Sequence, residues 1–316
     1  MAHNPGFPEP LSPMISTDFS TVRDLWRYAI TRFNQAQLYF GHGSSEAADE
    51  AAYLILHALR LPLDRLDPFL DAHLLPDEIA TLLGIIDRRS LNREPAAYIT
   101  QEAWLGSYRF FVDERVLVPR SFIAELIPQQ FSPWIADPFE VCDILELCTG
   151  SGCLSIMLAD AFPEARIDAT DISSQALAVA HKNVQDHALD ERIALMQSDL
   201  YLQIPPKRYD LIVTNPPYVN DVSMTALPAE YGHEPRIALA GGSDGMDLVR
   251  RILADAADRL NPDGLLIVEI GNERAHAEAA FPTLEMTWLT TSAGDDMVFL
   301  VTAEQLHSMD FFTKQA

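Results

Sequence analysis

A rigid polar turn follows a short apolar run in the second half of the chain. Residues 211–213 are Leu-Ile-Val, and soon after them come Asn215, Pro216, Pro217 and Tyr218. Each proline lacks an N–H and fixes φ, so the apolar run ends there and the turn is rigid. The turn offers a side-chain amide, backbone carbonyls and an aromatic ring to a ligand. An Asn-Pro pair is also common in plain turns, so these residues alone leave both interpretations open.

A second set of candidate residues lies upstream of this turn. A strand-like run leads through Glu146 into the small residues Cys-Thr-Gly-Ser-Gly-Cys at 148–153, and such turns bring backbone close to nucleotide-like ligands. Asp171 ends the next predicted strand, where a carboxylate can bond both ribose hydroxyls. Asp199 ends the third strand, within reach of an adenine amine. The predicted cofactor-binding residues are Glu146, Cys148, Thr149, Gly150, Gly152, Asp171, Ile172, Asp199, Leu200 and Asn215.

The chemistry of this second set narrows the class of ligand. No lysine or arginine stands in the glycine turn to meet a pyrophosphate, and the G-K-[ST] pattern is missing, which excludes a P-loop. A nucleoside without phosphate therefore suits the turn better than a dinucleotide. Acidic residues at three successive strand ends suit a neutral or cationic adenosyl ligand. S-adenosylmethionine, which carries a sulfonium, fits best.

Alternating strand and helix patterns position these residues. We predict strands over 141–147, 167–170, 193–196, 211–213 and 265–270, helices over 154–161, 174–187 (capped by Ser174) and 247–260, and a loop over 219–245. This alternation predicts an α/β domain with a parallel, doubly wound sheet. Two last strands, over 284–289 and 297–301, have no helix between them and should form an antiparallel edge. Ligands bind such sheets at the carboxyl ends of the strands, which places the candidate residues together.

The first hundred residues predict a small helical bundle. Apolar residues at helical spacing indicate three helices. The first covers 21–40 and the third covers 76–91. The second begins where Ser44 or Ser45 can cap it and ends at Pro62. Residues 104–118 indicate a hairpin whose turn is at 113–115, and Ser121 can cap a helix running to 130. The predicted organisation is a disordered tail (1–16), a helical substrate-recognition domain (17–100), a hairpin linker (101–120) and a catalytic domain (121–316).

The net charge and the cysteine content limit which partners the protein is expected to bind and in which cellular compartment it is expected to lie. With 46 acidic and 22 basic residues, the net charge is −24, which disfavours duplex nucleic acid as the main partner. The charge suits a basic protein partner, or it only keeps the protein soluble. We find no membrane-length apolar run and no signal-peptide pattern at the start. The three cysteines, Cys142, Cys148 and Cys153, are expected to be reduced thiols in the cytoplasm, and their spacing matches no metal site.

The order of these motifs resembles that of the class I, S-adenosylmethionine-dependent amino-methyltransferases, which have a Rossmann-like fold. The resemblance rests on the glycine turn, Asp171, Ser198-Asp199 and the Asn-Pro-Pro-Tyr turn. That turn occurs in enzymes that methylate adenine N6 or glutamine side chains. Further stretches resemble the protein-glutamine N5-methyltransferases, namely residues 94–99, 111–120, 234–239 and 241–245. The resemblance as a whole covers roughly residues 20 to 302.

Two branches of that family differ in substrate. One methylates peptide-chain release factors and usually has glycine where this chain has Cys148; the other methylates the third protein of the large ribosomal subunit. The turn at 148–153, residues 101–104 and residues 118–121 resemble the ribosomal-protein branch. A release factor, and then adenine in nucleic acid, are the alternative substrates, and a binding module without chemistry is a third alternative.

The resemblance implies roles for individual residues. Asn215 Oδ1 and the Pro216 carbonyl would accept the two N–H hydrogens of a substrate glutamine, with Tyr218 packing on the amide plane and S-adenosylhomocysteine as the product. Glu269 is expected to pack or to cap. The implied catalytic residues are Asn215, Pro216, Pro217 and Tyr218, and the implied substrate-binding residues are Asn215, Pro216, Tyr218 and Glu234.

Overall fold

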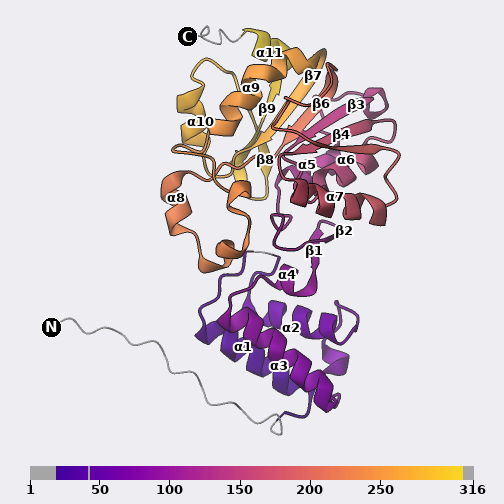
Figure 1. Cartoon of the computed structure of the whole chain (residues 1–316), viewed down its shortest axis with the longest axis vertical. Helices are drawn as coiled ribbons and strands as arrows, with labels where there is room; N and C mark the ends of the chain where they lie inside the picture. Colours follow the sequence, from indigo (N-terminus) through magenta and orange to yellow (C-terminus); the bar gives the residue numbers. More distant parts are fainter. Residues whose placement is uncertain (1–18, 42, 309–316) are drawn as a thin grey trace, which may run out of the picture. The chain divides into compact units, whose positions relative to one another are not determined.

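The computed structural model describes residues 19–41 and 43–308, which form two compact units divided between Thr100 and Gln101 (Figure 1). The predicted disordered tail over 1–16 lies outside the described residues. The first unit is helical and the second contains the sheet. No helix within the described residues has the length and apolar content needed to cross a membrane.

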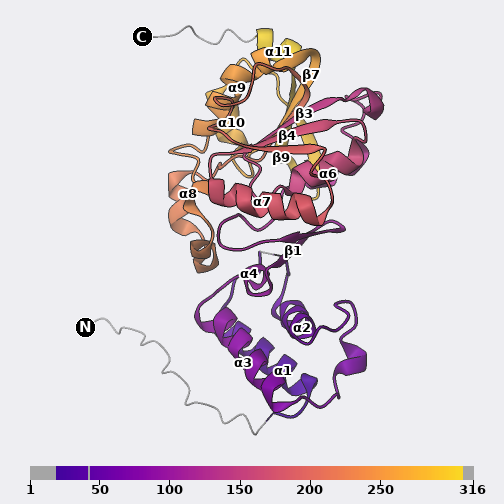
Figure 2. The ribbon, with the colours of Figure 1, turned by 45° about the vertical axis from the view of Figure 1, so that its right-hand side comes forward.

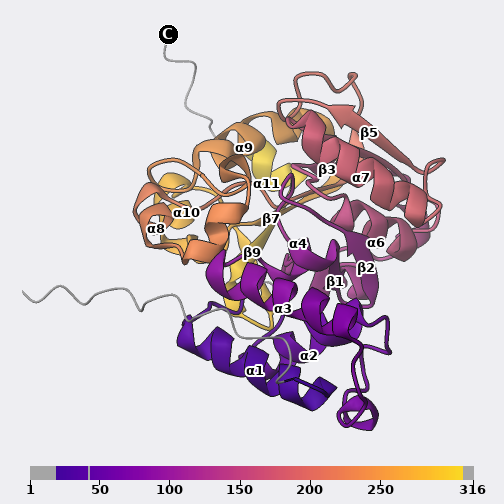
Figure 3. The same ribbon diagram turned by 60° about the horizontal axis from the view of Figure 1, so that its bottom comes forward.

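The first unit is a bundle of helices around one core. It contains α1 (Val22–Gln35), α2 (Ala47–Ala58), the 3-10 turn η2 (Asp67–Phe69), α3 (Pro76–Leu91) and α4 (Ala96–Thr100). Helices α1, α2 and α3 pack side by side (Figure 3). Their apolar faces bury Leu25, Phe33, Leu54 and Leu82 together. The prediction that Ser44 or Ser45 caps the second helix is wrong, because α2 begins after Glu46 and no side chain caps it.

The second unit begins with a hairpin. Strand β1 (Glu102–Leu105) pairs antiparallel with β2 (Tyr108–Phe111), so the hairpin turn is at Gly106-Ser107 and the prediction that the turn at 113–115 joins the hairpin strands is wrong. Residues 113–116 form a separate turn, because Asp113 accepts hydrogen bonds from the backbone and side chain of Arg115 and from Val116 N.

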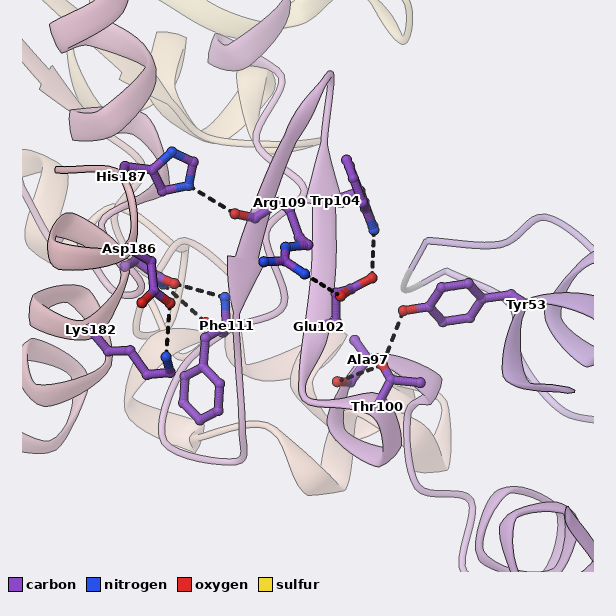
Figure 4. A network of polar contacts seen from close by, with 11 residues as sticks. Tyr53, Ala97, Thr100, Glu102, Trp104, Arg109, Phe111, Lys182, Asp186 and His187 are labelled. Atoms are coloured by element: carbon purple, nitrogen blue, oxygen red, sulfur yellow. Dashed lines mark hydrogen bonds and ion pairs between the residues drawn. The ribbon is translucent and has the colours of Figure 1, made fainter. Parts of the chain in front are cut away.

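Helix α7 (Ser174–Asp186) holds this hairpin. The buried amide of Asn183 accepts a hydrogen bond from Phe111 N (2.7 Å) and donates to Phe111 O (3.0 Å) and to Ser151 O (2.8 Å). Just beyond the helix, His187 Nε2 lies 2.9 Å from Arg109 O, and Lys182 lies over the Phe111 ring (Figure 4). The hairpin is therefore tied to both α7 and the glycine turn.

The sheet of the second unit has seven strands in the order β5-β4-β3-β6-β7-β9-β8. The first five in this order are parallel, whereas β9 pairs antiparallel with β7 and β8, which confirms the predicted doubly wound sheet with an antiparallel edge. The strands are β3 (Asp143–Leu147), β4 (Arg166–Asp171), β5 (Ile193–Gln197), β6 (Tyr209–Thr214), β7 (Leu260–Glu269), β8 (Thr287–Thr291) and β9 (Gly294–Thr302).

Helices cover both faces of this sheet. α6 (Cys153–Ala161) and α7 pack on one face, and α9 (Asp247–Arg259), α10 (Arg274–Ala280) and α11 (Ala303–Ser308) pack on the other (Figure 2). Central strand β6 is consequently fully buried from Leu211 to Thr214, which explains its uninterrupted apolar run.

Several predicted boundaries differ from the structure. Ser173 rather than Ser174 caps α7, because the Ser173 hydroxyl accepts the Ala176 N–H. Strand β7 starts at Leu260 rather than at 265 as predicted, because Leu260 pairs with Tyr209 ahead of a bulge. The predicted loop over 219–245 contains α8 (Asp221–Ala226) and the 3-10 turns η5 (Ala229–His233) and η6 (Arg236–Ala238). The helix predicted from Ser121 to 130 is shorter: α5 (Ile123–Leu126) and then the 3-10 turn η3 (Ile127–Gln129).

Candidate active site

The carboxyl ends of β3, β4, β5 and β6 surround one cavity of about 640 Å³. A cavity of this size at the carboxyl edge of a parallel sheet is typical of small-molecule sites. Most of the predicted site residues line it, namely Cys148, Gly150, Asp171, Ile172, Asp199, Leu200, Asn215 and Pro217. The other six are not among the residues that line it; they are Glu146, Thr149, Gly152, Pro216, Tyr218 and Glu234.

Glu146 supports the glycine turn from the interior. Its side chain is 2% exposed, and Oε2 accepts hydrogen bonds from Thr149 Oγ1 (2.6 Å), Ser155 N (2.9 Å) and the Ser155 hydroxyl. Burial raises the pKa of Glu146 to about 7, although these three donors act in the opposite direction. That Glu146 and Thr149 bind the cofactor stays a prediction; the described contacts show that the two side chains bond each other at the base of the turn.

The glycine turn leaves room at its surface for a ligand. Gly150 has φ +56°, and a Cβ placed there would meet no atom within 4 Å, so the backbone at this position faces open space in the cavity. Gly152 has a different structural role, because a Cβ at this position would lie 3.3 Å from Ala180 Cβ. Gly150 therefore permits close approach of a ligand to the backbone, and Gly152 permits close packing of the turn on α7.

Asp171 is held at the cavity wall by backbone donors. Oδ2 accepts the Gly150 N–H at 2.9 Å and Oδ1 accepts the Ser173 N–H at 2.8 Å. Burial raises the pKa of Asp171 above its usual range. Each carboxylate oxygen has a second lone pair, so the fixed carboxylate can still accept hydrogen bonds from two adjacent hydroxyls.

Asp199 has a basic partner that the sequence pattern did not reveal. Arg251, on α9, lies 2.8 Å from Asp199 Oδ2, and both line the cavity. Next to them Leu200 adopts φ +50°, and the Ser198 hydroxyl holds it by donating to Leu200 O at 2.5 Å. Arg251 lies one helix and one strand further along the chain, so no local spacing links it to Asp199.

Asn215 presents an unused amide to the cavity. The preceding residue, Thr214, fixes the end of β6 to β3 by donating to Leu147 O at 3.0 Å. Asn215 is half-buried and lines the cavity, yet among residues 19–41 and 43–308 no group hydrogen-bonds its side chain. The Asn215 amide is therefore available to hydrogen-bond a polar ligand that enters the cavity.

Tyr218 is enclosed by three glycines behind the turn. A Cβ at Gly241 would lie 2.7 Å from Tyr218 Cα, one at Gly245 would lie 2.2 Å from the Tyr218 carbonyl oxygen, and one at Gly271 would lie 2.5 Å from the ring. Val219 N also donates to Leu239 O (2.8 Å), and Gly241 N donates to Val219 O (2.9 Å). We call Gly241, Gly245 and Gly271 the glycine collar; it fixes the exit of the Asn-Pro-Pro-Tyr turn, and only glycine fits it.

Glu234 forms a buried ion pair. Arg120 donates to both of its carboxylate oxygens, at 2.6 and 2.7 Å, and Val118 N donates at 3.1 Å, while the Glu234 side chain is fully buried. Glu234 was predicted to contact the substrate, but the structure places it as a positioning residue that joins residues 118–120 to the loop after the turn. Bidentate pairs of this kind impose geometry as well as stability.

Glu269 has the capping role that was predicted for it. Its Oε2 accepts hydrogen bonds from the Ser121 hydroxyl at 2.5 Å and from Ile123 N at 3.3 Å, at the start of α5. Burial raises the pKa of Glu269 to about 7.

The two buried glutamates predict how stability depends on pH. Both carboxyls bind a proton more tightly in the folded protein than in the unfolded chain, so their contribution is complete below the usual value of 4.5 and is lost as pH rises through about 7. We expect Glu269→Gln to flatten the fall in melting temperature across this interval, because glutamine cannot ionise. Calorimetric unfolding checks this, with the exposed Glu304→Gln as control. An unchanged slope in Glu269→Gln would contradict the prediction.

Comparison with known proteins identifies the family. The sequence pattern of the methyltransferase small domain matches residues 135–230, which include the glycine turn and the Asn-Pro-Pro-Tyr turn. Proteins named ribosomal protein uL3 glutamine methyltransferase are similar over nearly their whole length. The relative from Burkholderia pseudomallei is 59% identical over 297 residues, covering 92% of this chain and 97% of the relative.

Two further relatives carry the same name. The protein from Bordetella pertussis is 56% identical, covering 92% of this chain and 98% of its own. The protein from Neisseria meningitidis serogroup B is 54% identical, covering 92% of this chain and 95% of its own. With its seven-stranded class I methyltransferase sheet, the chain therefore belongs to the ribosomal protein uL3 glutamine methyltransferase family.

Proposed function

We propose that the protein transfers a methyl group from S-adenosylmethionine to the side-chain nitrogen (N5) of a glutamine in ribosomal protein uL3. The observation that carries this proposal is the unpaired amide of Asn215, held at the cavity by a rigid turn. The names of the relatives support uL3 as the substrate.

The cavity residues fit S-adenosylmethionine. The open backbone at Gly150 and the fixed carboxylate of Asp171 suit a ribose, and the half-exposed Ile172 and the buried Leu200 offer apolar surface to an adenine. Asp199 would accept from the adenine amine. When bound, the cofactor supplies an electrophilic methyl group on a positively charged sulfur, which acidic cavity residues tolerate well.

The catalytic turn would act by holding the substrate amide. An amide nitrogen is a weak nucleophile because its lone pair is delocalised into the carbonyl. Asn215 Oδ1 and the Pro216 carbonyl would accept its two N–H hydrogens and aim the nitrogen into the cavity. Positive charge that develops on nitrogen would then be stabilised by acceptors that need no reorganisation, and the methylated nitrogen would lose one of its protons to water. Pro217 lines the cavity, and the partly exposed Tyr218 would pack on the amide plane while the glycine collar fixes its backbone.

The remaining assignments follow from charge and organisation. A net charge of −24 would attract a basic ribosomal protein over long range. We assign substrate recognition to the helical unit and catalysis to the unit that contains the sheet. The three cysteines form no disulfide, in keeping with a cytoplasmic enzyme.

Methyl transfer in parallel reactions tests the proposal. Purified uL3, a peptide-chain release factor and duplex DNA are each incubated with the protein and S-adenosylmethionine radiolabelled on the methyl group. We expect label on uL3 alone, and peptide mapping should place it on a glutamine. Label on the release factor or on DNA instead would contradict the proposal.

A further inference from the structure

Three arginines line the cavity, and they differ in their partners. Arg115 donates to Asp113 through Nε (2.8 Å) and Nη2 (2.5 Å), and Arg251 pairs with Asp199 at 2.8 Å. The Arg236 side chain is exposed, and in the described part of the chain no group forms a hydrogen bond or ion pair with its guanidinium. Arg236 is thus the cation of this cavity whose charge the described residues leave unmatched.

The carboxylates that line the cavity pair with groups other than Arg236. Asp171 is bonded to the Gly150 and Ser173 amides, and Asp199 is paired with Arg251. Asp247, which also lines the cavity, lies 3.5 Å from Arg250. In a chain with a net charge of −24, an arginine that escapes pairing beside a cavity is well placed to receive an anionic group of a ligand.

The backbone places Arg236 on the side of the catalytic turn. Its carbonyl accepts from Leu239 N (3.1 Å) and Ala240 N (3.0 Å), and Ala240 bridges in parallel to Val219, which follows the turn. Asp171 and Asp199 instead follow β4 and β5, which lie on the far side of β3 from β6. A ligand with its nucleoside at Asp171 and Asp199 would extend its other end across β3 towards β6 and Arg236.

We propose that Arg236 binds the α-carboxylate of S-adenosylmethionine, an inference that rests on the proposed function. At neutral pH the cofactor carries a sulfonium, an ammonium and one carboxylate, so the carboxylate is its sole anionic group. A guanidinium can bind a carboxylate through two parallel hydrogen bonds, which gives both affinity and orientation. Arg236 would thereby anchor the amino-acid end of the cofactor while Asp171 anchors the ribose.

Binding calorimetry without any methyl acceptor tests this assignment. S-adenosylmethionine, S-adenosylhomocysteine and decarboxylated S-adenosylmethionine are titrated into wild type, Arg236→Gln and Arg236→Lys. We expect Arg236→Gln to weaken the two carboxylate-bearing ligands about 10- to 100-fold and to leave the decarboxylated ligand unchanged. Arg236→Lys should recover part of the loss, because lysine keeps the charge without the fork. Arg109→Gln is the matched control: it removes one exposed positive charge outside the cavity.

Two outcomes would overturn the assignment. Equal weakening of all three ligands by Arg236→Gln would mean that the substitution only disturbs the loop. Unchanged cofactor affinity together with a raised KM for uL3 would assign Arg236 to the polypeptide. A failure of the proposed function looks different, because wild type would then bind no S-adenosylmethionine or would methylate another acceptor.

Discussion

Asn215→Ala should lower kcat for methyl transfer to uL3 by at least about 1,000-fold, in the range seen when a preorganised transition-state contact is removed. The affinity for S-adenosylmethionine should stay within about threefold of wild type, because the lost contact is one that the reacting amide makes. The Asn215 side chain has no hydrogen-bond partner in the described chain, so truncating it to alanine breaks no side-chain bond of the fold.

Single-turnover transfer of radiolabelled methyl groups measures the rate of methyl transfer, and calorimetry measures the affinity for S-adenosylmethionine. Asn261→Ala is a matched control. Asn261 bonds Asp210 at 2.6 Å near the start of β6, at the opposite end of the sheet from the cavity. This variant should transfer methyl groups at nearly the wild-type rate. Wild-type turnover by Asn215→Ala would remove the proposed mechanism.

Gly245→Ala should reduce kcat by about 100-fold or more while the protein remains folded, an effect expected when a reacting group is displaced by about 1 Å. The added Cβ would lie 2.2 Å from the Tyr218 carbonyl oxygen, a backbone atom that cannot swing aside as a flexible side chain could. Gly245 also has φ +79°, which an alanine adopts only with strain. The turn must shift, and Asn215, three residues before Tyr218, shifts with it.

The measurement compares kcat, cofactor affinity and melting temperature in this variant and in Gly232→Ala. A Cβ at Gly232 would meet no atom within 4 Å, so the control adds the same methyl group to the same loop without a clash. We expect near wild-type activity from Gly232→Ala. If Gly245→Ala were equally active, the glycine collar would not position the turn.

The sheet and the strand-end residues could be predicted from the sequence because their signals are local. Alternating apolar strands and helices fix the topology, and Asp171, Asp199 and Asn215 lie at or just beyond the ends of strands whose carboxyl ends share one edge. The direction of Glu146 could not be predicted so simply. Leu145 and Leu147 join one core cluster, so Glu146 between them points to the opposite face, where Ser155 of α6 bonds it.

The basic residues of the site could not be predicted from sequence patterns, because their place in the site depends on long-range folding. Arg251 comes from α9, and Arg236 from a 3-10 turn inside a segment that was predicted to be loop. Whether each arginine pairs with an acidic residue depends on folding distant segments together, and no periodicity encodes that. The predicted substrate contact of Glu234 failed likewise, because its partner Arg120 is more than a hundred positions away.

The three hydrogen bonds of Asn183 couple local unfolding of the hairpin to local unfolding of the glycine turn. The same side chain holds both groups of Phe111 and the carbonyl of Ser151, so a fluctuation that frees the hairpin also strips the turn of a donor. The two segments should therefore open and close as one cooperative unit in local unfolding, although more than thirty residues separate them. Anything that steadies the turn, a bound cofactor included, would raise the free-energy cost of opening the hairpin.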